Sequence, residues 1–323
     1  MKMQMLPTET TVGTILCHNI DDGQGGKACA KGHIIQAGDV ARLQALGLQS
    51  VYVVTLDAGD VHEDAAATRL AQAVMAGGVE ATRASTGRIN LLAQHHGVVT
   101  VKPDALQSVN SIDGLTVATL PRFGVVGAGK IAATVKIIPY AVSDASLKQA
   151  EAIGQAAGGI VGVRPLREMK VAIILTGSAA ARQQVTSTFE QPLRERVQAL
   201  GSQPQAAIFV AEEPKAIAQA LSAALKDGAG MVIIAGQTSI MDKDDITPQG
   251  IRLGGGATEH YGVPVEPGNL LLLAYAGAIP VLGAPGCARS RQTNVIDLVL
   301  PRLLSGEHMT RQDLIALGNG GLL

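Results

Sequence analysis

Two short glycine-containing loops carry the residues best suited to chemistry in this chain. Residues 236–239 (GQTS) follow the apolar segment 231–235, and residues 285–290 (PGCARS) follow the apolar segment 279–282. Short apolar runs of this kind are typical of buried parallel strands, and open α/β sheets bind ligands beyond the carboxyl ends of such strands. Glycine lets a backbone approach a phosphate, and hydroxyl groups add donors. Two such loops side by side could hold a phosphorylated small molecule.

Two carboxylates follow the first loop. Asp244 and Asp245 precede Thr247 and Pro248, a pair that is typical of a cap and a helix start. A carboxylate at that position could hold Mg²⁺, because hard cations take oxygen ligands. A closing helix is expected over residues 291–304, with its N-terminus at the second loop and its positive dipole end available to an anion.

The elements around these loops alternate between strand and helix. Strands are expected at 170–175, 206–210, 231–235 and 279–282, and helices at about 186–200 and 214–226. Alternation with short connections predicts βαβ units and a parallel sheet, so residues 166–323 should form a three-layer α/β/α domain.

The N-terminal half has another texture. Strands are expected at 51–54, 97–101, 115–118 and 131–138, and helices at 60–75 and after a cap at Asp39. We therefore expect residues 1–165 to form a β-rich α+β accessory region of one or two subdomains. The segment Gly87-Arg88-Ile89-Asn90 reads most simply as a solvated turn with a capping Asn, and otherwise as a segment that faces a ligand or a partner domain.

Composition limits the function classes. The 323 residues are 47% hydrophobic and 16% charged, with a formal net charge of -1 and no basic run, which argues against nucleic acid or an anionic membrane as partner. No apolar run reaches about 18 residues, the length needed to span a bilayer, and no signal peptide is evident. Cys17, Cys29 and Cys287 form no paired framework, so a reducing cytoplasm is expected.

The order of these motifs resembles a known family. A strand, a Gly-x-Thr-Ser loop, Asp-Ile-Thr-Pro at 245–248 and Pro-Gly-x-x-x-Ser at 285–290 resemble the molybdopterin-binding domain of molybdopterin adenylyltransferases, molybdenum insertases and competence-damage-type proteins. Residues 259–273 and 283–290 are similar to a bacterial subgroup often fused to a molybdenum cofactor nucleotidyltransferase. Motifs at 87–91 and 135–139 extend the likeness through most of the chain.

The resemblance implies roles for individual residues. The first loop would cradle the terminal phosphate of the pterin, and the second loop would face it. One of the acidic pair would be the residue needed for chemistry and for Mg²⁺: ungapped counting favours Asp244, while the sequence context favours Asp245. The implied cofactor-binding set is Thr176, Gly177, Ser178, Gly236, Gln237, Thr238, Ser239, Pro285, Gly286, Cys287, Arg289 and Ser290.

The departures from the family pattern decide between functions. Thr176-Gly177-Ser178-Ala179 stands where insertases usually carry Gly-Asp-Glu, and Gln237 replaces the second glycine of the first loop. The missing carboxylate makes a Mg²⁺-dependent reaction harder to build, whereas phosphate binding relies largely on backbone donors. The resemblance thus implies a carrier that holds molybdopterin or its molybdenum form and passes it to a nucleotidyltransferase or an apo-molybdoenzyme. The alternatives are an Mg²⁺-dependent enzyme that adenylates molybdopterin or inserts molybdate, and a dinucleotide pyrophosphatase. A homo-oligomer is expected from the family.

Two residues of the second loop leave alternatives open. Cys287 sits in a setting that lowers a thiol pKa, near a helix N-terminus and Arg289, although a loop cysteine is more often a small packing residue. Arg289 could clamp a phosphate, or it could pair with Glu266 or Asp297 at the surface.

Overall fold

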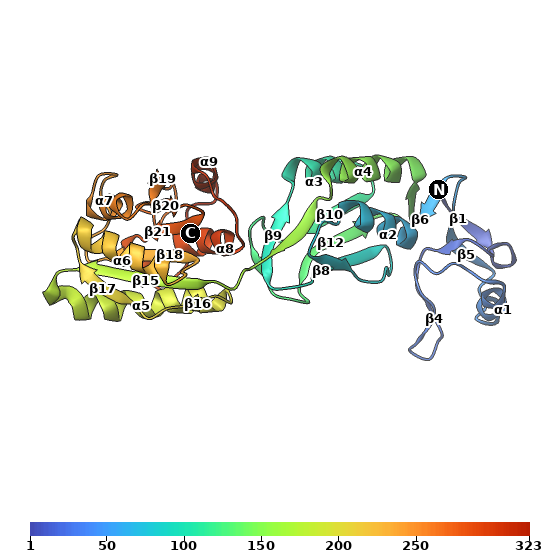
Figure 1. Cartoon of the computed structure of the whole chain (residues 1–323). Helices are drawn as coiled ribbons and strands as arrows, with labels where there is room; N and C mark the ends of the chain where they lie inside the picture. Colours follow the sequence, from blue (N-terminus) through green and yellow to red (C-terminus); the bar gives the residue numbers. More distant parts are fainter. The chain divides into compact units, whose positions relative to one another are not determined.

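The computed structural model describes residues 1–323 and divides the chain into two compact units, Met1–Arg164 and Pro165–Leu323 (Figure 1). No helix of the chain is both long enough and apolar enough to cross a bilayer.

The N-terminal unit is rich in β-structure. A three-stranded sheet has the order β1-β5-β2, a four-stranded sheet has the order β10-β12-β8-β7, and a three-stranded sheet has the order β11-β9-β14. The strands of this unit are β1 (Lys2–Pro7), β2 (Ile15–Leu16), β3 (Ile20–Asp21), β4 (Lys27–Cys29), β5 (Ser50–Thr55), β6 (Asp60–His62), β7 (Val79–Ala81), β8 (Arg88–Ala93), β9 (Gly97–Val101), β10 (Leu115–Thr119), β11 (Val125–Val126), β12 (Ile131–Ile137), β13 (Ala141–Ser143) and β14 (Val161–Pro165). Its helices are η1 (Thr8–Thr10), α1 (Ala37–Ala45), α2 (Glu63–Val74), α3 (Pro103–Asn110) and α4 (Asp144–Ala157).

Three local expectations for this unit were wrong in detail. Asp39 does not cap α1 but lies in its first turn, where its carboxylate accepts the N–H of the cap residue Gln36. The segment Asp60–His62 pairs as strand β6 with β13, so α2 begins only at Glu63. The segment expected as a solvated turn is the start of β8, and the side chain of Asn90 accepts the hydroxyl of Thr134 on β12.

The C-terminal unit has a single mixed sheet of order β16-β15-β18-β21-β20-β19, with β17 also paired to β15. Its strands are β15 (Lys170–Gly177), β16 (Gln203–Pro204), β17 (Ile208–Ala211), β18 (Met231–Gly236), β19 (Ala257–Tyr261), β20 (Leu272–Ala276) and β21 (Ile279–Gly283). Its helices are η2 (Ala179–Ala181), α5 (Arg182–Ala199), α6 (Pro214–Lys226), α7 (Ile246–Leu253), η3 (Gly286–Arg289), α8 (Val295–Leu304), α9 (Arg311–Ile315) and η4 (Ala316–Gly318).

The core of this unit shows why the domain has three layers. Alternate residues of β15 enter opposite clusters: Val171, Ile173 and Leu175 pack with the apolar faces of α5 and α8, whereas Ala172 and Ile174 pack with those of α6 and α7. A strand that is apolar on both faces needs helices on both sides. The predicted α/β/α architecture is therefore confirmed.

The sheet is mostly parallel rather than wholly so. Strands β15, β16, β17, β18 and β21 are parallel neighbours, but β20 runs antiparallel to both β21 and β19. Residues 277–278 join β20 to β21 in a two-residue hairpin, with Gly277 at a φ of 61°. A glycine between two apolar runs is the sequence signal for such a hairpin, because tight hairpin turns need a residue at positive φ.

Candidate functional site

The two glycine loops lie side by side. Strand β18 is hydrogen-bonded between β15 and β21 in parallel register, so the segments that follow these three strands meet at one edge of the sheet. A Cβ added to Gly286 would lie 3.3 Å from the hydroxyl oxygen of Ser239. Residues far apart in the chain thus line one short stretch of surface.

The first loop is tied to the turn after β15. The N–H of Gln237 donates to the carbonyl of Thr176 at 2.8 Å, and its side-chain Oε1 accepts the N–H and hydroxyl of Ser178 at 2.9 and 3.1 Å. A Cβ on Gly177 would approach the Gln237 side chain to 3.2 Å. Gln237, which replaces the second glycine of the family pattern, therefore fixes the position of the loop through its own side chain.

Gly236 makes close packing possible at the start of this loop. The Thr176 hydroxyl is fully buried and has no hydrogen-bond partner. A Cβ on Gly236 would collide with that hydroxyl oxygen. Only glycine fits at position 236 while Thr176 keeps its place.

Thr238 presents its donors to a carboxylate. Its backbone N–H and its hydroxyl both donate to Oε1 of Glu212, at 3.3 and 2.5 Å. Glu212 follows β17 and precedes α6, so it reaches the loop from the end of a strand that pairs with β15 and not with β18. The donors that were expected to cradle a phosphate hold an anionic oxygen of the chain itself.

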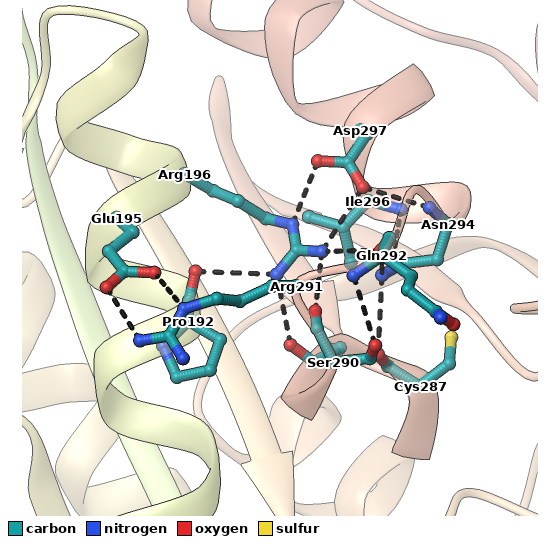
Figure 2. Close-up of polar contacts among 11 residues, drawn as sticks. Pro192, Glu195, Arg196, Cys287, Ser290, Arg291, Gln292, Asn294, Ile296 and Asp297 are labelled. Carbon is teal, nitrogen blue, oxygen red and sulfur yellow. Dashed lines mark hydrogen bonds and ion pairs between the residues drawn. The ribbon is translucent and has the colours of Figure 1, made fainter.

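The second loop is held from inside by Arg196 of α5, whose side chain is only 9% exposed (Figure 2). Its guanidinium donates to the carbonyls of Ala288, Ser290 and Gln292 at 3.2, 2.7 and 3.1 Å. It also forms a two-point ion pair with Asp297 of α8, at 2.9 and 3.2 Å. One planar cation therefore fixes the loop against two helices.

The polar groups of Ser290 largely turn toward its own loop. Its N–H donates to the carbonyl of Cys287, and its hydroxyl oxygen accepts the N–H of Gln292 at 3.1 Å. The α8 helix starts at Val295 with Asn294 as cap, not at residue 291, so its N-terminus does not open directly on this loop. The side-chain amide of Asn294 instead donates to the carbonyl of Cys287 at 3.3 Å (Figure 2).

For Arg289 and Cys287 the structure contradicts one of the two alternatives expected for each, namely the surface ion pair of Arg289 and the lowered thiol pKa of Cys287. Arg289 pairs with neither Glu266 nor Asp297; its Nε donates to the carbonyl of Gly286 at 2.7 Å, and its guanidinium lies 5.6 Å from the ring centroid of Phe189. Burial raises the pKa of the Cys287 thiol above its ordinary value. The expected low pKa was wrong, because desolvation of the thiolate outweighs the attraction of nearby cations.

The acidic pair serves the local fold. Asp245 is the cap of α7, and its two carboxylate oxygens accept the N–H groups of Ile246 at 2.7 Å and Met241 at 3.0 Å. Asp244 is exposed and pairs with Arg252 at 3.2 Å. No group of three or more His, Cys, Asp or Glu side chains suited to a metal ion occurs in the chain.

Sequence reasoning missed Glu212 and Arg196. A signal existed for Glu212, because an acidic residue follows the strand at 208–211 and so belongs to the same sheet edge. No local signal marks Arg196, which lies in the last turn of α5, far before the loop that it holds.

Comparison with known proteins places the C-terminal unit. Residues 172–305 match the family model described as a probable molybdopterin binding domain, and residues 5–55 match a domain family of unknown function. No curated protein matches the chain.

Several solved structures are similar to parts of the chain. A molybdenum cofactor biosynthesis protein B is 16% identical, with 43% of this chain and 95% of that chain covered and a TM-score of 0.32. The molybdopterin biosynthesis enzyme MoaB of Thermus thermophilus is 20% identical, with 43% of this chain and 98% of that chain covered and a TM-score of 0.33. The molybdopterin biosynthesis MoeA protein of Pyrococcus horikoshii is 15% identical, with 94% of this chain and 75% of that chain covered and a TM-score of 0.31. The assignment rests on the family match and not on these scores: the C-terminal unit of this chain belongs to the family of probable molybdopterin binding domains.

Proposed function

We propose that the C-terminal unit binds the phosphate of molybdopterin, or of its molybdenum form, between the loops at 236–239 and 285–290. The protein would then take part in molybdenum cofactor biosynthesis or delivery, passing the pterin to a nucleotidyltransferase or to an apo-molybdoenzyme. The observation that carries the proposal is the close approach of Ser239 to Gly286, which brings donors of both loops to one place.

The contact between Thr238 and Glu212 supports an anion at this site. One carboxylate oxygen accepts both the backbone N–H and the hydroxyl of Thr238, so the loop is already shaped to hold a negatively charged oxygen. Phosphate oxygens accept the same kind of charge-assisted hydrogen bond. A phosphate at this position would take the place of the Glu212 carboxylate.

The geometry supports a binding role better than a catalytic one. Both oxygens of Asp245 accept backbone N–H groups, and Asp244 faces Arg252. Mg²⁺ usually takes one or two carboxylates in addition to phosphate oxygens and water. In a magnesium-dependent adenylyl transfer, molybdate insertion or dinucleotide cleavage, Asp245 would have to bind the metal ion with the lone pairs that its two cap contacts leave free.

A binding measurement with the full chain tests the proposal. Titration with molybdopterin, followed by its fluorescence or by calorimetry, should give saturable binding that Ser239→Ala weakens roughly tenfold, the loss of one hydrogen bond to a charged group. Ser187→Ala is the matched control, because Ser187 is exposed on α5 and its hydroxyl only donates to the carbonyl of Gln184. Absence of binding by the wild-type chain would remove the proposal. Turnover that Asp245→Asn abolishes would favour the enzyme instead.

A further inference from the structure

The N-terminal unit contains a cavity of about 430 Å³ lined by charged side chains. One wall comes from the segment around β4, with Lys27 and Lys31, and the other from α2, β12 and the residues after it, with Glu63, Lys136 and Tyr140. The two motifs at 87–91 and 135–139 that the C-terminal function leaves unused meet at this place. The cavity therefore gives a common location to features that lie far apart in the sequence.

A buried carboxylate, that of Glu63, lines the cavity. The Glu63 side chain is 7% exposed and pairs with the Lys136 ammonium at 3.4 Å. A Cβ on Gly87 would lie 2.5 Å from its Oε2, and a Cβ on Gly32 would lie 2.9 Å from its Oε1, so two glycines make room for it. Oε1 receives no hydrogen bond from a protein donor, although a carboxylate usually accepts several. Glu63 can accept a donor from a ligand.

The residues beside Glu63 are held in a costly conformation. Thr86 has a φ of 51°, in the left-handed region that a β-branched residue seldom adopts. Its carbonyl accepts the Lys136 ammonium, and the N–H of Gly87 donates to Asp64 of α2 at 2.7 Å. Backbone conformations of this kind persist where the surrounding structure fixes them and are concentrated at binding sites.

Two lysines on the opposite wall lack carboxylate partners. The Lys31 ammonium lies 5.4 Å from the ring centroid of Tyr140, and the Tyr140 hydroxyl donates to the carbonyl of Cys17 at 2.6 Å. Neither Lys27 nor Lys31 has a carboxylate oxygen within ion-pair distance. Three lysines against one glutamate give the lining a net charge of +2. A phosphate monoester, which carries a charge of about -1.5 to -2 at pH 7, matches this charge better than a single carboxylate does.

We propose that this cavity is a second binding site, for a small phosphate monoester that also carries a hydroxyl or amino group. The phosphate lies against Lys27 and Lys31, and the hydroxyl or amino group donates to Oε1 of Glu63. The site is separate from the C-terminal loops and gives the N-terminal unit a ligand of its own.

Calorimetry of the full chain with ribose 5-phosphate as probe tests the site. The wild type should bind, and the double variant Lys27→Gln/Lys31→Gln should bind at least tenfold more weakly, since both charge-assisted contacts are removed. Lys130→Gln is the matched control, because Lys130 is an exposed lysine of the same unit outside the cavity. Thr238→Val controls for binding at the C-terminal loops. Lys130→Gln should bind as the wild type does, any part of the binding that Thr238→Val removes belongs to the C-terminal loops, and thermal unfolding should show that every variant is folded.

Four results would overturn the proposal. The double variant could bind as tightly as the wild type, or the wild type could fail to bind at millimolar ligand; either result removes the site. If Thr238→Val loses the binding instead, the probe sits in the C-terminal unit. If inorganic phosphate binds as tightly as ribose 5-phosphate, the ligand gains nothing from the contact assigned to Glu63. The proposal of a phosphate monoester as ligand is then wrong.

Discussion

The two glycine loops of the C-terminal unit have similar sequences of small and hydroxyl residues but are fixed in opposite ways. The loop at 236–239 directs the donors of Thr238 toward a side chain from a neighbouring loop, the carboxylate of Glu212. In the loop at 285–290, the carbonyls of Ala288 and Ser290 accept hydrogen bonds from the buried guanidinium of Arg196. The carbonyl of Gln292, two residues beyond the loop, does the same. The first loop presents donors to a carboxylate, although its Gln237 side chain also accepts from Ser178, whereas the second loop is held through its carbonyl acceptors.

This difference assigns the loops different tasks. A site for an anion needs donors that a ligand can reach, and the first loop has a pair of donors whose present partner a ligand could replace. The second loop forms a fixed wall, because Arg196 ties it to both α5 and α8 (Figure 2). Preorganised donors on a rigid support are the arrangement that favours specific binding.

Among the variants that test this difference between the loops, removal of Arg196 should have the largest effect, and it should act on the stability of the C-terminal unit. We expect Arg196→Met to lower the free energy of unfolding of the C-terminal unit by about 2–3 kcal/mol, because Asp297 and four carbonyls lose a donor. The value lies below that for a fully buried pair, since Asp297 is partly exposed. Chemical denaturation of the full chain measures the change, and amide hydrogen exchange of β21 identifies the unit that unfolds.

Arg291 provides the control for that variant. It forms a two-point pair with Glu195 at 2.8 and 2.9 Å, but at an exposed position (Figure 2). Arg291→Met should therefore cost no more than about 1 kcal/mol. Equal losses in the two variants would show that the second loop does not depend on its buried cation.

Removal of Glu212 should have a smaller effect, on the first loop. We expect Glu212→Ala to raise the affinity of this loop for inorganic phosphate about five- to tenfold, because the competing carboxylate and its negative charge are gone. The amide resonance of Thr238, followed by NMR during a phosphate titration, reports on this loop alone. Glu213→Ala is the control, since the neighbouring carboxylate makes no cap hydrogen bond. Unchanged or weaker binding by Glu212→Ala would mean that Glu212 supports the site and does not compete for it.

The smallest expected effect concerns the thiol of the second loop. Because burial raises the pKa of Cys287, a smaller fraction is thiolate at any given pH than in an ordinary cysteine, and the thiolate is the reactive form. In a Cys17→Ser/Cys29→Ser background, alkylation by iodoacetamide at about pH 8 should be several-fold slower than that of free cysteine and should rise further as the pH passes about 9. Rapid alkylation at neutral pH would restore the idea of a reactive thiolate.

The sequence was most informative where structure is local. The helix expected at 214–226 has those bounds, because Pro214 fits the first turn and Gly228 follows its end. The expected start of the last large helix was wrong by four residues, because Asn294 and Asp297 form a capping box that the apolar pattern does not reveal. The antiparallel β20 was missed although a glycine hairpin marks it.

The sequence by itself determined the family motif, the apolar strands and the two loops that follow them. Those features depend on the periodicity of apolar residues and on glycine, which act over a few positions. Only the tertiary structure decided which groups face the loops and which lysines share a cavity with Glu63. These contacts join residues far apart in the chain, and their partners are selected by the packing of layers and by the need to satisfy buried polar groups.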